Sequence, residues 1–292
     1  MIDGLPLVDV HLHVARLPTL KLPPHAWAPF ADRAALGELY DQEGAIRPDR
    51  FDAFLEAEGV DVALLMSEYS PRVTGLQPVE DLLPLLAHNP RRFRLIANLN
   101  PHLHHPIAEE LERQLALGAV AVKLHPVHGG FSPTEGPLYL VYQRCAELGV
   151  PVVFHCGTST FPGAVNRYGD PTPIDEVVQH VPDLKVVLAH GGRGWWYEAA
   201  AFLALARENV WIELSGLPPQ RLPDYYARPG LRRLARKFIF GSDWPGAPGI
   251  AANARALAKL DIDEEDLPGV LAGNARKVYR GLDPEPPDPV AG

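Results

Sequence analysis

The chain has 292 residues, of which 47% are hydrophobic, and it carries a formal net charge of -9 at pH 7. This composition favours a sizeable folded core, while the negative charge and the absence of a Lys/Arg cluster argue against nucleic acid as a partner. No stretch approaches 18 uninterrupted apolar residues, and no basic segment precedes an apolar one at the N-terminus. We therefore expect no membrane span and a cytoplasmic protein that acts on a small molecule.

Short β-branched runs bounded by Gly, Pro or Asn predict about eight strands, at Leu7–Val14, Val60–Ser67, Phe93–Leu99, Ala119–Leu124, Val152–His155, Lys185–His190, Val210–Leu214 and Phe238–Ser242. Helical spacing fills most of the gaps, at Arg50–Glu58, Ile107–Leu117, Leu138–Leu148, Ile174–Val181, Glu198–Glu208, Gly230–Arg236 and Ala251–Leu260. Alternating strands and helices predict a parallel sheet, and eight such units favour an α/β fold of the (β/α)8 TIM barrel type. An open sheet stays possible, because the number of strands does not prove closure.

The barrel is expected to form one domain over Met1–Leu282. The remaining segment, Asp283–Gly292, is rich in proline and charge, which predicts a disordered tail. Two connections, Ala15–Asp49 and Cys156–Thr172, are too long for simple turns and leave the carboxyl ends of predicted strands. Because barrel enzymes build their sites at that end, we expect these long loops to wall or cover a pocket.

The first predicted strand carries two histidines, His11 and His13, in a run of β-branched and apolar residues. In a strand, residues two apart project from the same face, so Asp9, His11 and His13 are expected to point one way. Two imidazoles side by side at the end of a strand can hold one divalent ion. The only cysteines, Cys145 and Cys156, make neither a disulfide framework nor a thiolate zinc site, so any metal must be held by nitrogen and oxygen.

Four further predicted strands end in a single ionisable residue after an apolar run: Lys123, His155, His190 and Asp243. Each alone has a structural explanation, such as a hydrogen-bonded histidine or a turn-capping aspartate. Together they would meet at one barrel mouth, where imidazoles and a carboxylate suit zinc or another divalent ion. We expect His11, His13, His155 and Asp243 to bind the metal. Near a metal-activated water, His190 would act as base or acid.

At these motifs the chain resembles the amidohydrolase superfamily, in particular the amidohydrolase-related branch that includes aminocarboxymuconate-semialdehyde decarboxylase, aromatic-acid decarboxylases and hydrolases. The resemblance runs from Val8 to about Arg280 and rests on Asp9-Val-His11-Leu-His13, Gly118-Ala-Val-Ala-Val-Lys123-Leu-His125-Pro, His155, His190-Gly-Gly, Val210-Trp-Ile-Glu-Leu-Ser215-Gly, Gly241-Ser-Asp243-Trp-Pro and Gly273-Asn274-Ala. It implies a (β/α)8 barrel with a divalent metal, usually zinc, on His11, His13, His155 and Asp243. It also implies that His190 assists proton transfer and that Asp243 accepts the proton of an attacking water.

The number of metal ions is a separate question, because superfamily members with two metals use a carboxylated lysine at the position of Lys123. In that arrangement His155 and His190 would hold the second ion. The Lys-Leu-His-Pro motif also resembles members with one metal. We expect one Zn²⁺ per chain, in the pattern of three protein ligands and water.

Arg193, Trp196 and Asn98 are candidates for binding substrate. A guanidinium at Arg193 can pair bidentately with a carboxylate, and a tryptophan can cover an apolar ring. Asn98 follows the third predicted strand. Loop packing explains each of these residues equally well. A homodimer is possible, since dimers are the commonest oligomers.

The residues leave three functions open. The first expectation is a metal-dependent hydrolase, in which activated water attacks an amide, ester or lactone and Asp243 takes the proton. The alternative is a nonoxidative decarboxylase of a small, possibly aromatic, carboxylic acid, which would use the same ligands. A metal-binding protein without turnover is the third, and a structural zinc site would be closed rather than open at a barrel mouth.

Overall fold

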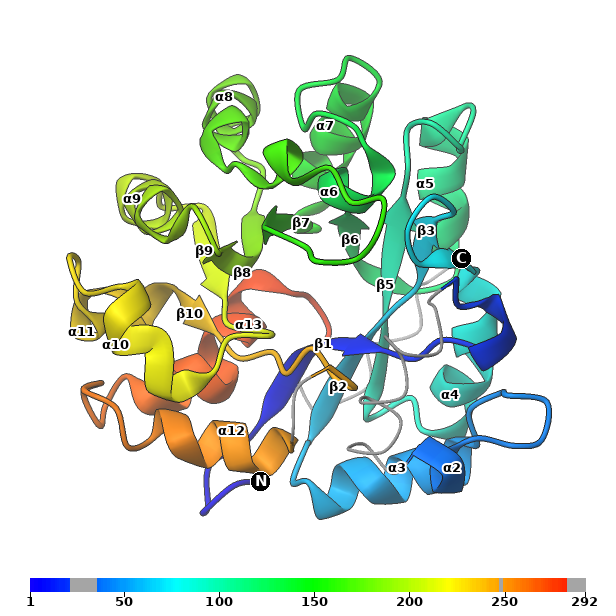
Figure 1. Cartoon of the computed structure of the whole chain (residues 1–292), viewed down its shortest axis with the longest axis horizontal. Coiled ribbons are helices and arrows are strands. Elements are labelled where there is room, and N and C mark those ends of the chain that lie inside the picture. Colours follow the sequence, from blue (N-terminus) through cyan, green and yellow to red (C-terminus); the bar gives the residue numbers. More distant parts are fainter. Residues whose placement is uncertain (22–35, 247–248, 283–292) are drawn as a thin grey trace.

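The computed structural model describes residues 1–21, 36–246 and 249–282 (Figure 1). Within these residues a parallel sheet of eight strands follows the order of the chain: β1 (Val8–His13), β2 (Val62–Met66), β5 (Phe93–Leu99), β6 (Ala119–Leu124), β7 (Val152–Gly157), β8 (Val186–Arg193), β9 (Val210–Glu213) and β10 (Phe238–Ile239). Two short antiparallel strands, β3 (Glu68–Ser70) and β4 (Gly75–Gln77), form a hairpin after β2.

The sheet closes through the segment that follows β10. The amide of Asp243 donates to the carbonyl of His11 at 3.0 Å, and the amide of His13 donates to the carbonyl of Trp244 at 2.8 Å. These bonds place the last strand beside the first and exclude an open sheet. The predicted TIM barrel is therefore confirmed, although β10 ends at Ile239, earlier than expected, because the following backbone bonds to β1 instead of extending the ladder.

Helices surround the strands (Figure 1), and their bounds are α2 (Leu36–Leu39), α3 (Pro48–Ala57), α4 (Leu83–His88), α5 (Ile107–Ala116), α6 (Pro126–Gly129), α7 (Leu138–Leu148), α8 (Thr172–His180), α9 (Tyr197–Ala206), α10 (Leu222–Tyr225), α11 (Leu231–Leu234), α12 (Ile250–Leu257) and α13 (Asn274–Val278). Shorter turns are η1 (Leu17–Thr19), η2 (Val79–Leu82), η3 (Asn166–Gly169), η4 (Pro219–Arg221), η5 (Ala235–Lys237) and the π-turn η6 (Gly269–Gly273). The sequence did not predict α4 or α6, which are too short for a helical period. None of the described helices has the length and hydropathy needed to cross a membrane.

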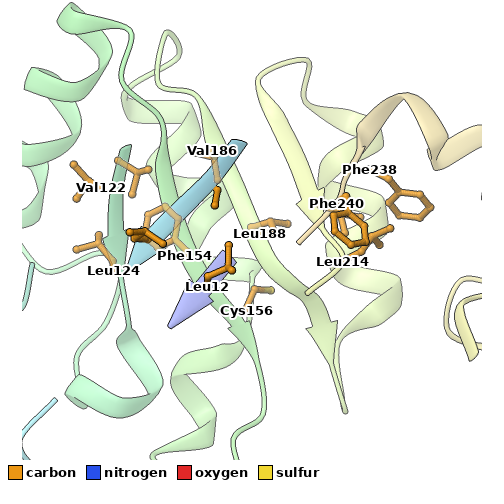
Figure 2. Close-up of a cluster of buried hydrophobic side chains, with 14 of the residues drawn as sticks. Leu12, Val122, Leu124, Phe154, Cys156, Val186, Leu188, Leu214, Phe238 and Phe240 are labelled. Atoms are coloured by element: carbon orange, nitrogen blue, oxygen red, sulfur yellow. The ribbon is translucent and has the colours of Figure 1, made fainter. Parts of the chain in front are cut away.

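Alternate strand residues build two apolar clusters, as the two-residue period of strands requires. The outer cluster lies between the strands and the helices and includes Leu12, Phe154 and Leu188 (Figure 2). The second cluster contains the other set of strand positions, such as Val153 and Val187, together with C-terminal residues of the barrel. His155 has the same parity in β7 as Val153 of this second set, and it lines the cavity described next.

Strand β1 departs from regular alternation. Its register against β2 shifts between Asp9 and Leu12, which marks a β-bulge. The expectation that Asp9 points the same way as His11 and His13 is therefore wrong. Val8 and Val10 belong to the second cluster, whereas the Asp9 carboxylate accepts from the amides of His11 at 3.1 Å and Ser242 at 2.9 Å. The Asp9 carboxylate thus connects β1 to the segment after β10 that closes the barrel.

Candidate metal centre and active-site cavity

A cavity of about 890 Å³ opens at the carboxyl ends of the strands. Its lining includes His13, His155, His190 and Asp243. Both long loops contribute to its wall: the described part of the first supplies Ala15 and Leu20, and the second supplies residues 158–161. The prediction that these loops wall a pocket is confirmed for the described residues; residues 22–35 of the first loop lie outside them.

Three of the predicted ligands converge on one point. The Nε2 atoms of His11 and His13 are 3.1 Å apart, and each lies 3.5 Å from Oδ1 of Asp243. Atoms that each lie about 2.0–2.2 Å from one tetrahedral ion are roughly 3.3–3.6 Å from one another. The observed separations therefore fit one divalent ion held by two imidazoles and a carboxylate.

His155 is an independent observation that fits a bound metal ion. The residue is 2% exposed, and neither of its ring nitrogens has a hydrogen-bond partner among the described residues. Burial lowers the pKa of His155 well below its usual value, and the nearby positive groups act in the same direction. A buried imidazole left neutral and unpaired is costly unless it coordinates a cation. The residues present therefore fit the metal that the sequence predicts.

His11 is oriented by residues behind it. Its Nδ1 lies 2.7 Å from Oε1 of Glu213 and 3.1 Å from the hydroxyl of Ser215, which leaves Nε2 for a metal ion. Metal-binding histidines commonly donate their second N–H to a carboxylate in this way. Burial raises the pKa of Glu213 to about 8, an effect that the charge of Lys123 opposes. Glu213 and Ser215 thus make hydrogen bonds within the barrel.

His190 and Asp243 both have left-handed backbone conformations, with φ of 65° and 67°. Such angles are strained for residues other than glycine and gather at functional sites. The Nδ1 atom of His190 lies 2.9 Å from the carbonyl of Ser215, which can only accept, so Nδ1 carries the proton. Burial lowers the pKa of His190 well below its ordinary value, with Arg193 adding to the shift. His190 therefore offers a neutral acceptor, Nε2.

Lys123 is 1% exposed, and its ammonium nitrogen has no hydrogen-bond partner among the described residues. Burial lowers the pKa of Lys123, whereas the carboxylates of Glu213, Glu68 and Asp243 act in the opposite direction. A buried lysine of this kind can serve as a neutral amine. Its role as a bridging, carboxylated ligand stays a prediction.

The three candidates for substrate binding have different surroundings. Arg193 lines the cavity, with its Nη1 3.5 Å from Oδ2 of Asp243. Asn98 is 2% exposed and donates its side-chain amide to the carbonyl of Ser67. Trp196 packs edge-on against Trp195. Among the described residues that line the cavity, only Arg193 of these three is present.

A second polar cluster in the cavity wall was not predicted. Glu68 begins β3, His128 lies in α6 and Ser159 follows β7. All three are buried and line the cavity. Glu68 follows the apolar strand β2 and Lys123 lies near the end of the apolar strand β6, so the same sequence signal was present. His128 and Ser159 come together only through loops, which leave no local pattern.

The fold is that of TIM-barrel enzymes, and its cluster of imidazoles and a carboxylate can hold a divalent metal ion. A sequence model described as Amidohydrolase matches residues 8–281, and the chain belongs to this family. The resemblance to the amidohydrolase superfamily is thereby confirmed.

One curated relative is the 2-keto-4-carboxy-3-hexenedioate hydratase of a Sphingobium strain, which is 28% identical over 207 residues, or 60% of this chain. The chain matches 61% of that relative's length. An uncharacterised TIM-barrel protein from Bordetella bronchiseptica has a TM-score of 0.74 at 21% identity, over 94% of this chain and 98% of the other. A dihydroxybenzoic acid decarboxylase from Polaromonas, with bound manganese and an inhibitor, has a TM-score of 0.64 at 18% identity, over 94% and 96%. These two likenesses show the fold.

Proposed function

We propose that this protein is a metal-dependent nonoxidative decarboxylase of a small carboxylic acid. The observation that carries the proposal is the guanidinium of Arg193, which lies in the cavity 3.5 Å from the predicted metal ligand Asp243. A guanidinium binds a carboxylate through two parallel hydrogen bonds. The decarboxylase and the hydratase among the similar proteins also favour a lyase over the hydrolase that the sequence suggested first.

The metal would be held by His11, His13, His155 and Asp243. A bound divalent ion supplies a Lewis acid that polarises a substrate oxygen. Both zinc, which the sequence predicts, and manganese, which the similar decarboxylase contains, accept this nitrogen and oxygen ligand set. We propose one ion per chain.

Decarboxylation breaks a carbon–carbon bond, releases carbon dioxide and leaves an electron pair that must take up a proton. His190 is a poor donor, because its one proton is committed to the carbonyl of Ser215 at 2.9 Å. Asp243 lies in the cavity, and its side chain is 20% exposed, so solvent can return a proton to it. We therefore assign the proton transfer to Asp243. We assign to His190 the role of a hydrogen-bond acceptor that orients the reacting group.

Hydration of a carbon–carbon double bond is a second candidate, supported by the 28% identity to the hydratase. Water would then add its oxygen to one carbon of an unsaturated acid, with Arg193 on the substrate carboxylate. Asp243 would accept a proton from the water and deliver it to the neighbouring carbon. The two reactions share a carboxylic acid substrate and differ in whether carbon dioxide leaves.

The deciding experiment incubates the protein, loaded with Zn²⁺ or Mn²⁺, with a panel of hydroxybenzoic acids and unsaturated 2-oxo acids. Carbon dioxide release is expected for at least one acid and is expected to vanish in Asp243→Asn. Loss of the conjugated ultraviolet absorbance without carbon dioxide release would favour the hydratase. Hydrolysis of esters or lactones with neither signal would contradict both. Whether the protein forms a homodimer is a separate question, which sedimentation equilibrium answers.

A further inference from the structure

The turn that follows β9 contacts both of the charged groups that the proposed reaction uses. Gly216 lies in this turn and lines the cavity together with Arg193 and Asp243. The amide of Gly216 donates to the carbonyl of Ser242 at 3.3 Å, which connects the turn to the residue before Asp243. Backbone bonding therefore holds Gly216 next to the segment that carries a predicted metal ligand.

The position of Gly216 has no room for a side chain. A Cβ atom there would lie 2.6 Å from Nη1 of Arg193 and 2.6 Å from Oδ2 of Asp243. Van der Waals contacts to carbon are about 3.5–4.0 Å long, so a side chain would displace at least one of these two groups. Gly216 also has a φ of 65°, which favours glycine for a separate, conformational reason.

Arg193 is directed towards Gly216 by the loop after β7. The carbonyl of Thr158 accepts from Nε and Nη2 of Arg193, both at 3.3 Å. The ion pair of Nη1 with Oδ2 of Asp243, at 3.5 Å, occupies a third N–H. A guanidinium has five N–H donors, so one remains on each terminal nitrogen for the two oxygens of a carboxylate.

The two oxygens of Asp243 face different groups. Oδ1 lies 3.5 Å from Nε2 of both His11 and His13, whereas Oδ2 faces Arg193. The amide of Asp243 also donates to the carbonyl of His11 at 3.0 Å, so the residue is anchored by its backbone. Arg193 reaches the site through a long side chain with many rotamers. Arg193 is therefore the group that a side chain at position 216 would displace.

We propose that Gly216 is a positioning residue, which leaves room for the guanidinium of Arg193 between Thr158 and Asp243 and so directs it at the substrate carboxylate. Gly216 acts through Arg193 and takes no part in the reaction itself. A side chain at this position is expected to weaken recognition of the acid while the metal site persists. The position of Arg193 can be measured without a substrate, whereas its effect on the acid rests on the proposed function.

Chemical labelling reports the position of Arg193 directly. Phenylglyoxal reacts with arginine side chains, and peptide mass spectrometry gives its rate at Arg193 in protein loaded with Mn²⁺. Gly216→Ala is expected to speed this labelling about fivefold or more, because the displaced guanidinium loses hydrogen bonds that each contribute about that factor. The affinity for Mn²⁺, measured by competition with a chelator, should stay close to the native value, since Oδ1 of Asp243 keeps its place.

Gly281→Ala is the matched control. Gly281 has a φ of 66°, but a Cβ atom there would meet nothing within 4 Å, so this variant has the backbone strain without the steric conflict. It should be labelled at Arg193, and should bind Mn²⁺, like the native protein. Gly216→Asn is the second variant, because asparagine tolerates a positive φ better than alanine and still introduces the Cβ atom. It should show the faster labelling even if Gly216→Ala does not fold.

Steady-state kinetics of carbon dioxide release separates positioning from general damage. In Gly216→Ala the KM is expected to rise about tenfold or more, with a smaller change in kcat, because a charge-assisted bond to the carboxylate is weakened. The same substitution should change the KM of Arg193→Met far less, since the group that it displaces is already absent. An equal change in both backgrounds would overturn the proposal.

Equal rates of labelling at Arg193 in Gly216→Ala, Gly216→Asn and Gly281→Ala would also overturn it. Loss of Mn²⁺ affinity in Gly216→Ala with unchanged labelling would show that Asp243 is displaced instead, which contradicts the proposal as well. Faster labelling with an unchanged KM supports the positioning and counts against carboxylate binding by Arg193. Faster labelling without carbon dioxide release from any acid supports the positioning and counts against the proposed reaction alone.

Discussion

Oε1 of Glu213 lies 2.7 Å from Nδ1 of His11, and both side chains are fully buried. This contact connects β9 to β1 across the interior of the barrel. It fixes the ring of His11 so that Nε2 faces His13 and Asp243. The carboxyl group of Glu213 on β9 therefore orients His11, the predicted metal ligand on β1.

Glu213→Gln is expected to weaken metal binding by about 10- to 100-fold, the usual cost of losing a carboxylate behind a metal-bound histidine. The amide retains the size of the side chain but replaces the carboxyl group whose Oε1 lies 2.7 Å from Nδ1 of His11. Competition with a chromophoric chelator measures the affinity. Glu112→Gln, which alters an exposed partner of Arg144, is the control and should bind metal like the native protein. Equal affinity in both variants would contradict the role of Glu213.

Metal binding is expected to stabilise the fold, because it satisfies one of the two unpaired nitrogens of buried His155. A free ion at about 100 times its Kd adds about 2.7 kcal/mol to the free energy of unfolding. The midpoint of thermal unfolding should therefore rise when Zn²⁺ or Mn²⁺ is added and fall with a chelator. His155→Ala should lose most of this metal-dependent rise. Retention of the full rise in this variant would show that His155 is not a ligand.

Sequence patterns predicted most of the barrel and the centre of its site for a physical reason. An ionisable residue that follows an apolar run is rarely part of the apolar core, and so His155 and Asp243 were recognised. Their convergence follows from the parallel sheet, which brings all carboxyl ends to one side. The cluster of His128 and Ser159 has no such period, because loop geometry alone brings these residues together.

Asn98 shows that a polar residue near the end of a strand does not always belong to the site. It lies near the end of a strand, as His155 does. Its side-chain amide donates to the carbonyl of Ser67, and its backbone amide donates to Oε1 of Gln114. The sequence gives no sign that a glutamine on α5 reaches this strand. A polar residue at a strand end is thus a candidate ligand only until its tertiary hydrogen bonds are known.

We expect one metal ion per chain and an unmodified Lys123. The ammonium nitrogen of Lys123 is buried without a partner, and Lys123 is not among the described residues that line the cavity. Elemental analysis should give one equivalent of metal, and native mass spectrometry should show no added carbon dioxide. Two equivalents of metal, with the mass of one carbon dioxide on Lys123, would overturn the mononuclear assignment.

The metal-free protein is expected to lose stability as the pH falls from about 7 towards 5.5. Burial lowers the pKa of five histidines in the folded protein: His11, His13, His125, His155 and His190. Below their ordinary pKa of 6.5, these residues bind more protons in the unfolded chain than in the folded one. Stability then rises with pH and is lost as pH falls through this window. Asp9 and Glu213, with pKa values raised to about 7 and about 8, act in the opposite direction but are outnumbered.

Urea unfolding at pH 7.5 and pH 5.5 measures this effect as a lower midpoint at the acidic pH. His190→Gln should reduce the difference, since it removes one histidine that is neutral only in the folded state. His180→Gln alters an exposed histidine and should leave the difference unchanged. A midpoint that does not depend on pH would contradict the buried, neutral state of these imidazoles.

Arg193→Met is expected to lower kcat/KM for the decarboxylated acid by about 10²-fold, chiefly through a higher KM, because a charge-assisted bond to a carboxylate contributes about 1.5–3 kcal/mol. The methionine fills part of the cavity wall but offers no donor. The variant also frees Oδ2 of Asp243 from a cation 3.5 Å away, so some loss in kcat is expected too.

Arg193→Lys, which retains the charge without the planar fork, should recover part of the KM. Steady-state kinetics of carbon dioxide release separates the two effects. Arg228→Met, on an exposed arginine that pairs with Glu198, is the control. An unchanged KM in Arg193→Met would remove the observation on which the proposed decarboxylase rests.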